Sequence, residues 1–312
     1  MKTSKSQDDE PATVVSNCAC GKVSVRVQIP SQQEDGSVTA VDCHCPACRK
    51  FHVAAFGSYL KVPAESVQLG NVEDLQSYTE TCHEVGPVER LFCRHCYTKV
   101  ATKPQSAESD NSPATMLVNM GGLVDKTIPK AYQKAWSHER TVWQPSSEAT
   151  WTNAKPRKRR GNQMPPLLTT STGSCSCGKC QYQIHHVPYE MQHCYCKLCR
   201  QLCGSAYQSW IPVMNEDIVW NTTTNEGPIL KRTTEHGKRH FCTTCGSCLT
   251  IVYDEQPDCT WPAAGGLDDA SLPSTTEDMN LYLERVCHIC CIWKQSWYAL
   301  PSDGMERIKY AC

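Results

Sequence analysis

The sequence predicts a mainly β protein made of two tandem copies of one small metal-binding domain. Three observations support this prediction. Four short motifs recur in the same order along the chain, the cysteines gather in closely spaced groups, and segments between them alternate polar and apolar residues as β-strands do. No long stretch shows the apolar periodicity of an α-helix. We therefore expect two domains of the same fold joined by a linker.

The duplication is seen in four pairs of motifs. They are CACGKV (18–23) with CSCGKC (175–180), CHCPACR (43–49) with CYCKLCR (194–200), FCRHC (92–96) with FCTTC (241–245), and GGL (121–123) with GGL (265–267). The offset falls from 157 residues (175 minus 18) to 144 (265 minus 121). This steady fall indicates small loop insertions in the first copy, and SQQEDGS (31–37) is a candidate for one.

The domain limits follow from the repeat. The first domain is predicted at 14–150 and the second at 171–305. Residues 151–170 are polar, basic and interrupted by Pro and Gly, which is typical of a linker.

Strands are expected where the alternation is clearest. Residues 23–29 follow the first cysteine motif and alternate over their whole length. The matching segments 54–62 and 205–213 are also expected to be strands, with turns at Pro63 and Pro212 near their ends.

Cysteine is the unusual feature of the composition, at 23 of 312 residues. A disulfide scaffold and metal sites are the two competing interpretations. The first 17 residues lack the apolar core of a signal peptide, and no apolar run is long enough to cross a bilayer. We therefore expect a reducing compartment, the cytoplasm or, given the basic run at 155–161, the nucleus. Closely spaced thiols there favour metal.

The first and third motifs of each copy together offer four thiolates, which is the set that a structural zinc prefers. The repeat excludes Cys180 and Cys248 from these sets, because Val23 and Lys99 occupy the matching positions. Cysteines without a repeated partner are expected to be free thiols: Cys82, Cys259, Cys287, Cys290, Cys291 and Cys312. The predicted structural ligands are Cys18, Cys20, Cys93 and Cys96 in the first copy and Cys175, Cys177, Cys242 and Cys245 in the second.

The middle motif of each copy offers three thiolates, here called a trio: Cys43, Cys45 and Cys48, and Cys194, Cys196 and Cys199. Three protein ligands and an open position are typical of a zinc that exchanges ligands or catalyses. We expect such an ion to accept an external thiolate, water or a carbonyl oxygen. The alternative is that His52 or Cys203, each four residues after its trio, closes the site.

These motifs resemble those of the family of glutathione-dependent formaldehyde-activating enzymes and centromere protein V. The family pattern is C-x-C-G, then C-H-C-x2-C-R-K, then F-C-x2-C-G, and it covers nearly the whole chain once per copy. The resemblance implies small zinc-pinned β-sheets, a structural zinc on each four-cysteine set, and the zinc associated with activity on each trio. It also implies carbon–sulfur lyase chemistry, the joining of glutathione to formaldehyde.

Both copies depart from the family pattern. In the first, Tyr97 and Val53 stand where the family and the second copy have Gly. A residue directly after a zinc knuckle often has a positive φ, which is costly for Tyr. In the second, Tyr195 replaces the middle-motif His, which is His44 in the first copy. The second copy is the nearer match overall.

The predicted function is a zinc-dependent, carbon–sulfur lyase-like activity on a glutathione adduct of a small aldehyde, with the trio cysteines as the catalytic set. Zinc would deprotonate a bound thiol, and His44 or Tyr195 is a candidate acid. Arg49 and Arg200 follow the trios and can pair with a glutathione carboxylate or offset the thiolate charge.

A non-catalytic zinc module is the alternative function. The basic linker would then contact a protein or nucleic-acid partner. The formal net charge of −1 argues against a nucleic-acid surface spread over the whole molecule.

Overall fold

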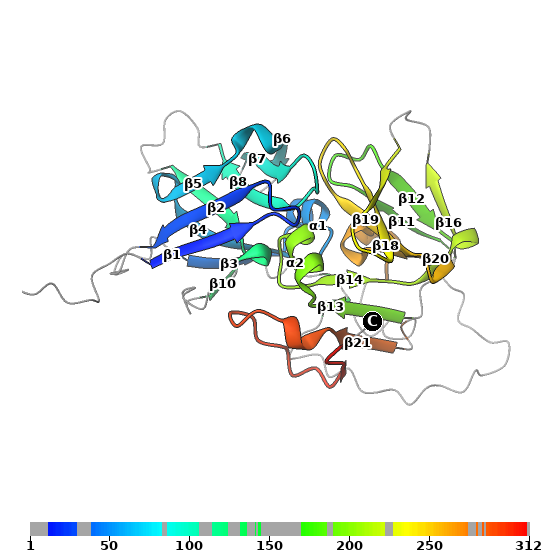
Figure 1. Ribbon diagram of the computed structural model, residues 1–312. Helices are drawn as coiled ribbons and strands as arrows, with labels where there is room; N and C mark the ends of the chain where they lie inside the picture. The colour runs from blue at the N-terminus through cyan, green and yellow to red at the C-terminus, as the bar shows by residue number, and fades with distance from the viewer. Residues whose placement is uncertain are drawn as a thin grey trace, which may run out of the picture.

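The computed structural model describes residues 12–29, 39–82, 86–105, 114–123, 132–135, 141, 143–144, 170–185, 190–221, 227–273, 279, 283 and 285–310 (Figure 1). The first half is the described part of 12–144 and the second half that of 170–310. The predicted insertion at 31–37, Cys312 and, except for Thr170, the predicted linker lie outside the described residues. Within these ranges no helix has the length and apolarity needed to cross a membrane.

The first half is built from two sheets. The smaller one has the order β1 (Ala12–Asn17), β2 (Ser24–Ile29), β5 (Val67–Gly70), and every pairing in it is antiparallel. The strand expected at 23–29 is β2, and its alternate residues Val25, Val27 and Ile29 are buried. The larger sheet runs in the order β10 (Tyr132–Ala135), β3 (Thr39–Cys43), β4 (Gly57–Pro63), β9 (Thr115–Asn119), β8 (Lys99–Pro104), β7 (Gly86–Cys93), β6 (Leu75–Cys82).

The second half repeats this arrangement, with its larger sheet divided. The small sheet has the order β11 (Ser171–Ser174), β12 (Gln181–Ile184), β16 (Ile218–Asn221). One part of the larger sheet is β14 (Gln208–Trp210), β13 (Glu190–Cys194), β21 (Arg285–Ile289) and β22 (Glu306–Arg307). The other is β15 (Val213–Met214), β20 (Gln256–Pro262), β19 (Cys248–Tyr253), β18 (Gly237–Phe241) and β17 (Ile229–Arg232). The predicted mainly β fold is confirmed.

The division of the second sheet has a local cause. The single strand expected at 205–213 is observed as β14 and β15, whereas its counterpart β4 is continuous. Pro212 lies between the two pieces and has no N–H to donate to a neighbouring strand. The two parts of the sheet remain joined by a bridge between Trp210 and Ala263.

The described residues contain two α-helices, one directly after the start of each middle motif. They are α1 (Pro46–His52) and α2 (Lys197–Cys203). Cys45 and Cys196 are the N-caps, and each sulfur accepts the N–H of the residue three positions later. Both helices end at a left-handed residue, Val53 with φ 50° and Gly204 with φ 72°.

The two halves pack on each other through these helices. Figure 1 shows α1 and α2 side by side between the two sets of sheets. Helix α1 contacts the 3-10 turn η7 (Ala264–Gly266) of the second half, and α2 contacts the turn η4 (Met120–Gly122) of the first. The repeated GGL motif forms these turns, so each half supports the helix that carries part of the other half's trio.

The departures of the first half from the family pattern lie at this interface. Tyr97 has φ 60°, as predicted for its position, and its partner Gly246 has φ 70°. The Tyr97 ring stacks on Phe241 of the second half at 4.8 Å between centroids. A Cβ on Gly246 would lie 2.7 Å from the Phe92 ring, so the second half keeps glycine where the first half's aromatic ring approaches. The contact with Phe241 offsets the left-handed strain of Tyr97.

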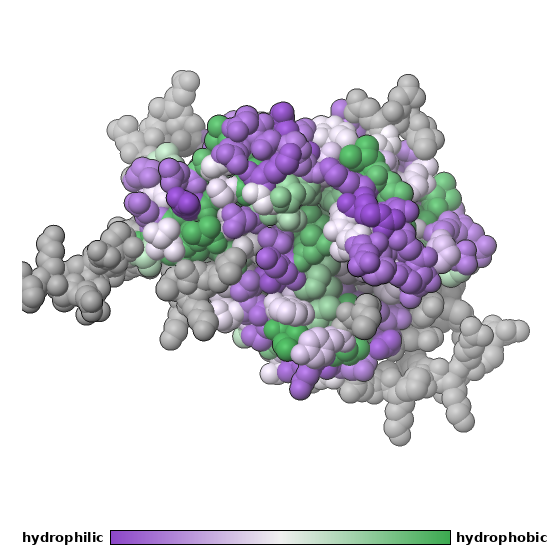
Figure 2. Space-filling view, in the orientation of Figure 1, coloured by the Kyte–Doolittle hydropathy of each residue, from purple (hydrophilic) through white to green (hydrophobic). Residues whose placement is uncertain are grey.

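The outer surface is mixed in polarity. On the face shown in Figure 2, hydrophilic residues surround small separate apolar patches. Few large apolar side chains among the described residues are at least half exposed. Trp293, at 57%, is one of them. Single exposed apolar residues of this kind are normal for a folded protein.

Candidate metal centres

The cysteines gather in four groups in the described residues, and within each group all the sulfurs lie within 4.8 Å of one another. Two groups have four members and two have three, and each can hold a metal ion. They are the sets that the sequence predicts: Cys18, Cys20, Cys93 and Cys96; Cys175, Cys177, Cys242 and Cys245; Cys43, Cys45 and Cys48; Cys194, Cys196 and Cys199. Cys180 and Cys248 belong to neither four-membered group, as the repeat predicts.

The four-cysteine groups have the spacing of a tetrahedral site. In the first half, the sulfur of Cys20 lies 3.4 Å from that of Cys18 and 3.8 Å from that of Cys93. In the second half, the sulfurs of Cys177 and Cys242 are 3.5 Å apart. Zinc–sulfur bonds of about 2.3 Å give a tetrahedron with edges of about 3.8 Å. Each group joins the turn after the first strand of its half to the turn of a late hairpin.

A hydroxyl group supports each of these groups at the same repeated position. Thr98 Oγ1 lies 3.3 Å from the sulfur of Cys96, and Ser247 Oγ lies 3.3 Å from that of Cys245. Thr98 also accepts the Ala19 N–H at 3.0 Å and so fixes the opposite turn of the site. Such outer contacts orient metal ligands. The cysteine motifs do not include Thr98 and Ser247, although the repeat aligns them.

Each trio is assembled from three kinds of local structure. Cys43 ends a strand, Cys45 caps the helix, and Cys48 lies in the first helical turn. The helix fixes the spacing because the Cys48 N–H donates to the sulfur of Cys45 at 3.4 Å. The trio of the first half is enclosed, with its three cysteines 2–5% exposed. In the second half Cys196 is half-buried and is the most exposed residue of its trio, because Cys194 and Cys199 are 6% and 3% exposed.

His52 and Cys203, the alternative fourth ligands, are hydrogen-bonded elsewhere. His52 Nε2 lies 2.6 Å from the Tyr59 hydroxyl, and its Nδ1 contacts the Cys203 carbonyl. Burial lowers the pKa of His52 to about 3, so the ring is neutral at pH 7. The sulfur of Cys203 lies 3.5 Å from the Tyr207 carbonyl. Neither residue belongs to the group of mutually close thiols in its half.

A buried arginine contacts the last cysteine of each trio. Arg90 Nη2 donates to the sulfur of Cys48 at 3.5 Å, and Arg239 Nη2 donates to that of Cys199 at 3.6 Å. Both arginines are 2% exposed. The cysteine motifs do not include these arginines, but the repeat contains the signal, because each lies three residues before the first cysteine of the third motif.

These contacts favour the thiolate form of the last cysteine. Hydrogen bonds from the other two trio thiols, and then the charge of Arg90, hold the pKa of Cys48 well below its usual range. The same two causes, with Arg239 as the cation, lower the pKa of Cys199. A second donor lies at another repeated position, where the Tyr59 hydroxyl is 3.2 Å from the sulfur of Cys48 and Trp210 donates to Cys199.

Replacing Arg239 by Met should weaken metal binding at the second trio by about 10–100-fold, the usual effect of losing an outer contact to a ligand. The substitution removes the charged donor to the Cys199 sulfur but leaves all three trio sulfurs in the chain. Competition with a chromophoric chelator measures the affinity. Arg232→Met is the matched control, because that side chain is 47% exposed and pairs with Asp254. Equal affinities in both variants would show that Arg239 does not act on the site.

Arg49 and Arg200, predicted beside the trios, connect the two halves in this structure. Arg49 forms an ion pair with Asp269 of the second half. Arg200 Nη1 donates to the Gly121 carbonyl of the first half at 2.9 Å, and its Nε donates to the Tyr195 carbonyl at 3.0 Å. Both arginines therefore hold a trio helix against the opposite half. Their predicted contact with a carboxylate of glutathione stays a prediction.

The two candidate acids lie in a buried cluster between the halves. His44 is 1% exposed and its Nδ1 lies 3.0 Å from Gln144 Oε1. The Tyr195 hydroxyl is 2.9 Å from His288 Nδ1, and His288 Nε2 is 2.8 Å from Asp303 Oδ2. No sequence motif predicted His288 or Asp303, which the C-terminal segment brings to this cluster.

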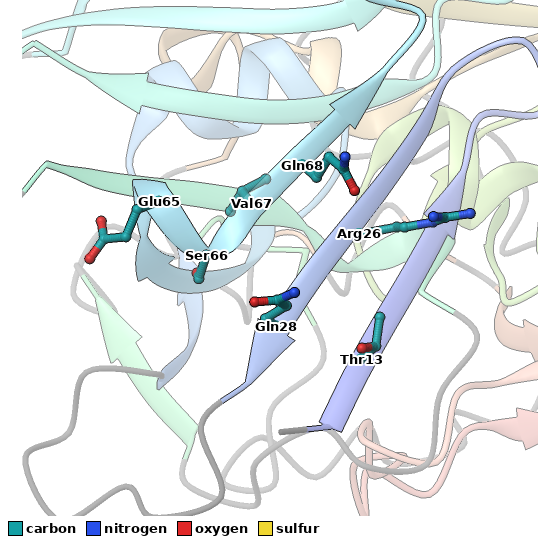
Figure 3. Close-up of a pocket in the computed structure, with 7 residues that line it drawn as sticks. All are labelled: Thr13, Arg26, Gln28, Glu65, Ser66, Val67 and Gln68. Carbon is teal, nitrogen blue, oxygen red and sulfur yellow. The ribbon is translucent and has the colours of Figure 1, made fainter. Parts of the chain in front are cut away.

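A separate pocket of about 510 Å³ lies on the outer face of the small sheet of the first half (Figure 3). Arg26 and Glu65 are its charged lining residues, and Figure 3 shows them on opposite sides of it. No cysteine lines this pocket, so it adds nothing to the four metal centres.

Comparison with known protein families gives the same division into halves. A family model described as "Glutathione-dependent formaldehyde-activating enzyme" matches residues 13–145 and again 170–285. A protein of Halomonas elongata named "Putative glutathione-dependent formaldehyde-activating enzyme" is 27% identical over 140 residues, 43% of this chain and 83% of that protein. A crystal structure of a Rhodobacter sphaeroides protein, 18% identical, covers 38% of this chain and 98% of its own, with a TM-score of 0.27.

Proposed function

This chain belongs to the glutathione-dependent formaldehyde-activating enzyme family, with two tandem copies of the family domain, and from that premise we propose that it is a zinc-dependent carbon–sulfur lyase. Its substrate would be a glutathione adduct of a small aldehyde, as the family description suggests. Each half would hold one structural zinc on its four-cysteine group and one zinc on its trio. Thiolate donors at these spacings suit zinc, which supplies Lewis-acid chemistry that lowers the pKa of a bound thiol.

The second half is the proposed site of the chemistry. The observation that carries this assignment is the half-buried Cys196, since a substrate can reach a metal site only where part of it is open. The trio of the first half is 2–5% exposed and offers no such approach. We therefore assign catalysis to Cys194, Cys196 and Cys199 and a supporting role to Cys43, Cys45 and Cys48.

Residues around the second trio have defined roles in this proposal. Arg239 keeps Cys199 in its thiolate form and balances part of the negative charge of the sulfur set. Trp210 donates a second hydrogen bond to the same sulfur and fills the space beside it. Arg200 holds α2, and with it Cys199, against the first half. We propose that Arg49 likewise holds α1 against the second half.

Calorimetric titration of the zinc-loaded chain with glutathione is the test, with S-methylglutathione as the control. We expect glutathione to bind and the methylated compound not to bind, because only a free thiol can become a zinc ligand. Binding of both compounds would place recognition away from the metal. Binding of neither would contradict the proposed substrate and favour a zinc module without catalysis.

A further inference from the structure

The buried arginines beside the two trios have different partners. In the first half, Arg90 forms an ion pair with Glu80, whose Oε1 accepts the Arg90 Nε–H at 2.7 Å. In the second half, Arg239 Nη1 donates to the Thr233 hydroxyl. Arg239 Nε is buried and has no hydrogen-bond partner in the part of the chain that the structure describes. The second half therefore keeps a charged donor that the first half pairs with its own carboxylate.

Thr233 takes the place of Glu80 in the second half. Each lies two residues beyond the residue that pairs with its arginine on the neighbouring strand. These pairs are Tyr78 with Arg90 and Lys231 with Arg239. Side chains two residues apart on a strand point to the same face, so Glu80 and Thr233 both lie beside their arginines. Threonine is shorter and uncharged, and it contacts a different nitrogen of the guanidinium.

The unpaired donor lies on the side of the guanidinium that faces the second trio. Nε and Nη2 form one edge of this planar group, and their N–H bonds point the same way. Arg239 Nη2 donates to the sulfur of Cys199 at 3.6 Å. In the first half, the same edge of Arg90 contacts the sulfur of Cys48 at 3.5 Å and the carboxylate of Glu80. The Glu80 carboxylate therefore shows where an anionic oxygen fits beside a trio sulfur.

The surroundings of Arg239 are partly open. Cys196 and Trp261 are half-buried, and both pack against the apolar cluster that contains Cys199. Trp261 lies on the same face of the sheet as Arg239, because Ile251 pairs with both residues. The Trp261 Nε1–H is a second buried donor without a hydrogen-bond partner among the described residues. Donors left unpaired in a folded protein indicate a place for an acceptor that the chain itself does not supply.

We propose that Arg239 Nε binds a carboxylate of the thiol substrate, in the place that Glu80 occupies in the first half. This inference rests on the proposed function, because it takes a thiol at the second trio as given. It adds the substrate class, a thiol that also carries a carboxylate, as glutathione does. It also explains why the halves differ, since Glu80 already fills this place in the first half.

Calorimetric titration of the zinc-loaded chain with glutathione and with glutathione diethyl ester tests this inference. The two compounds share the thiol, but the ester has no free carboxylate. We expect the Kd of the ester to be at least about tenfold higher, because it loses a charge-assisted hydrogen bond to a buried arginine.

Thr233→Glu supplies the carboxylate from the chain, as Glu80 does in the first half. We expect this variant to bind glutathione at least about tenfold more weakly and to bind glutathione and its ester equally. Thr234→Glu is the matched control, because it adds the same charge at the next residue, which is exposed. Native mass spectrometry of each variant checks that its zinc content is unchanged.

Equal binding of glutathione and its ester by the unmodified chain would overturn the inference and leave the proposed function standing. Unchanged glutathione binding in Thr233→Glu, or equal weakening in Thr234→Glu, would also overturn it, because Arg239 would not be the partner. No glutathione binding by the unmodified chain would instead overturn the proposed function. If Thr233→Glu fails to fold, Thr233→Gln replaces it, since its amide oxygen accepts the same N–H without a buried charge.

Discussion

We expect Cys196→Ser to lower the thiol-dependent activity at least about 100-fold. The structural zinc of the second half should stay bound in this variant. Serine cannot supply the thiolate, and the same sulfur accepts the Cys199 N–H that fixes the start of α2. The four-cysteine group of that half is built from other segments, the turn after β11 and the turn between β18 and β19. Its ion should therefore remain. Turnover and native mass spectrometry on one preparation measure both effects.

The matched variant is Cys45→Ser, which makes the same change at the equivalent position of the first half. Retained activity there assigns the chemistry to the second half, as the half-buried Cys196 indicates. Loss of activity from Cys45→Ser alone would reverse the assignment. Loss of both second-half ions from Cys196→Ser would show that the structural and trio sites are not separable.

The second large effect is expected at the interface between the halves. Gly265→Ala and Gly121→Ala should each lower the free energy of unfolding by about 3 kcal/mol. A Cβ on Gly265 would lie 2.1 Å from the Ala54 N, and one on Gly121 would lie 2.0 Å from the Arg200 carbonyl oxygen. Both contacts are with backbone of the opposite half, so no side chain can rotate away. The helices α1 and α2 must then move, and their trios with them.

Thermal unfolding and zinc release together measure this effect. Gly227→Ala is the control, because a Cβ there would meet nothing within 4 Å and the effect should be within about 0.5 kcal/mol. We also expect the Gly265 variant to release zinc faster from the first trio, whose helix it displaces. Unchanged stability in both interface variants would mean that the halves separate at little cost.

The interface explains why the first half departs from the family pattern. Val53 and Tyr97 both have positive φ values that glycine adopts at the matching positions of the second half. A β-branched residue in that conformation is strained by about 1–2 kcal/mol. Val53 is fully buried against the second half's Gly266, and Tyr97 stacks on Phe241. Contacts between the halves thus compensate for local strain in one of them.

The sequence by itself determined the duplication, the mainly β class and the fourteen cysteines that the structure gathers into four groups. It could do so because zinc ligands must come from short, regular spacings, and a repeat shows which spacings recur. The positive φ of Tyr97 was predicted from the same comparison. Alternation was enough to predict the β2 strand, because one face of that strand is buried.

Only the tertiary structure decided which residues surround the trios and how the halves meet. Cys82 reaches Cys45 of the first trio from a hairpin more than thirty residues away, which no local spacing predicts. Arg49 and Arg200 follow the trios in sequence but point to the opposite half. Local spacing fixes the ligands of a metal, whereas packing of distant segments fixes its surroundings and its access to substrate.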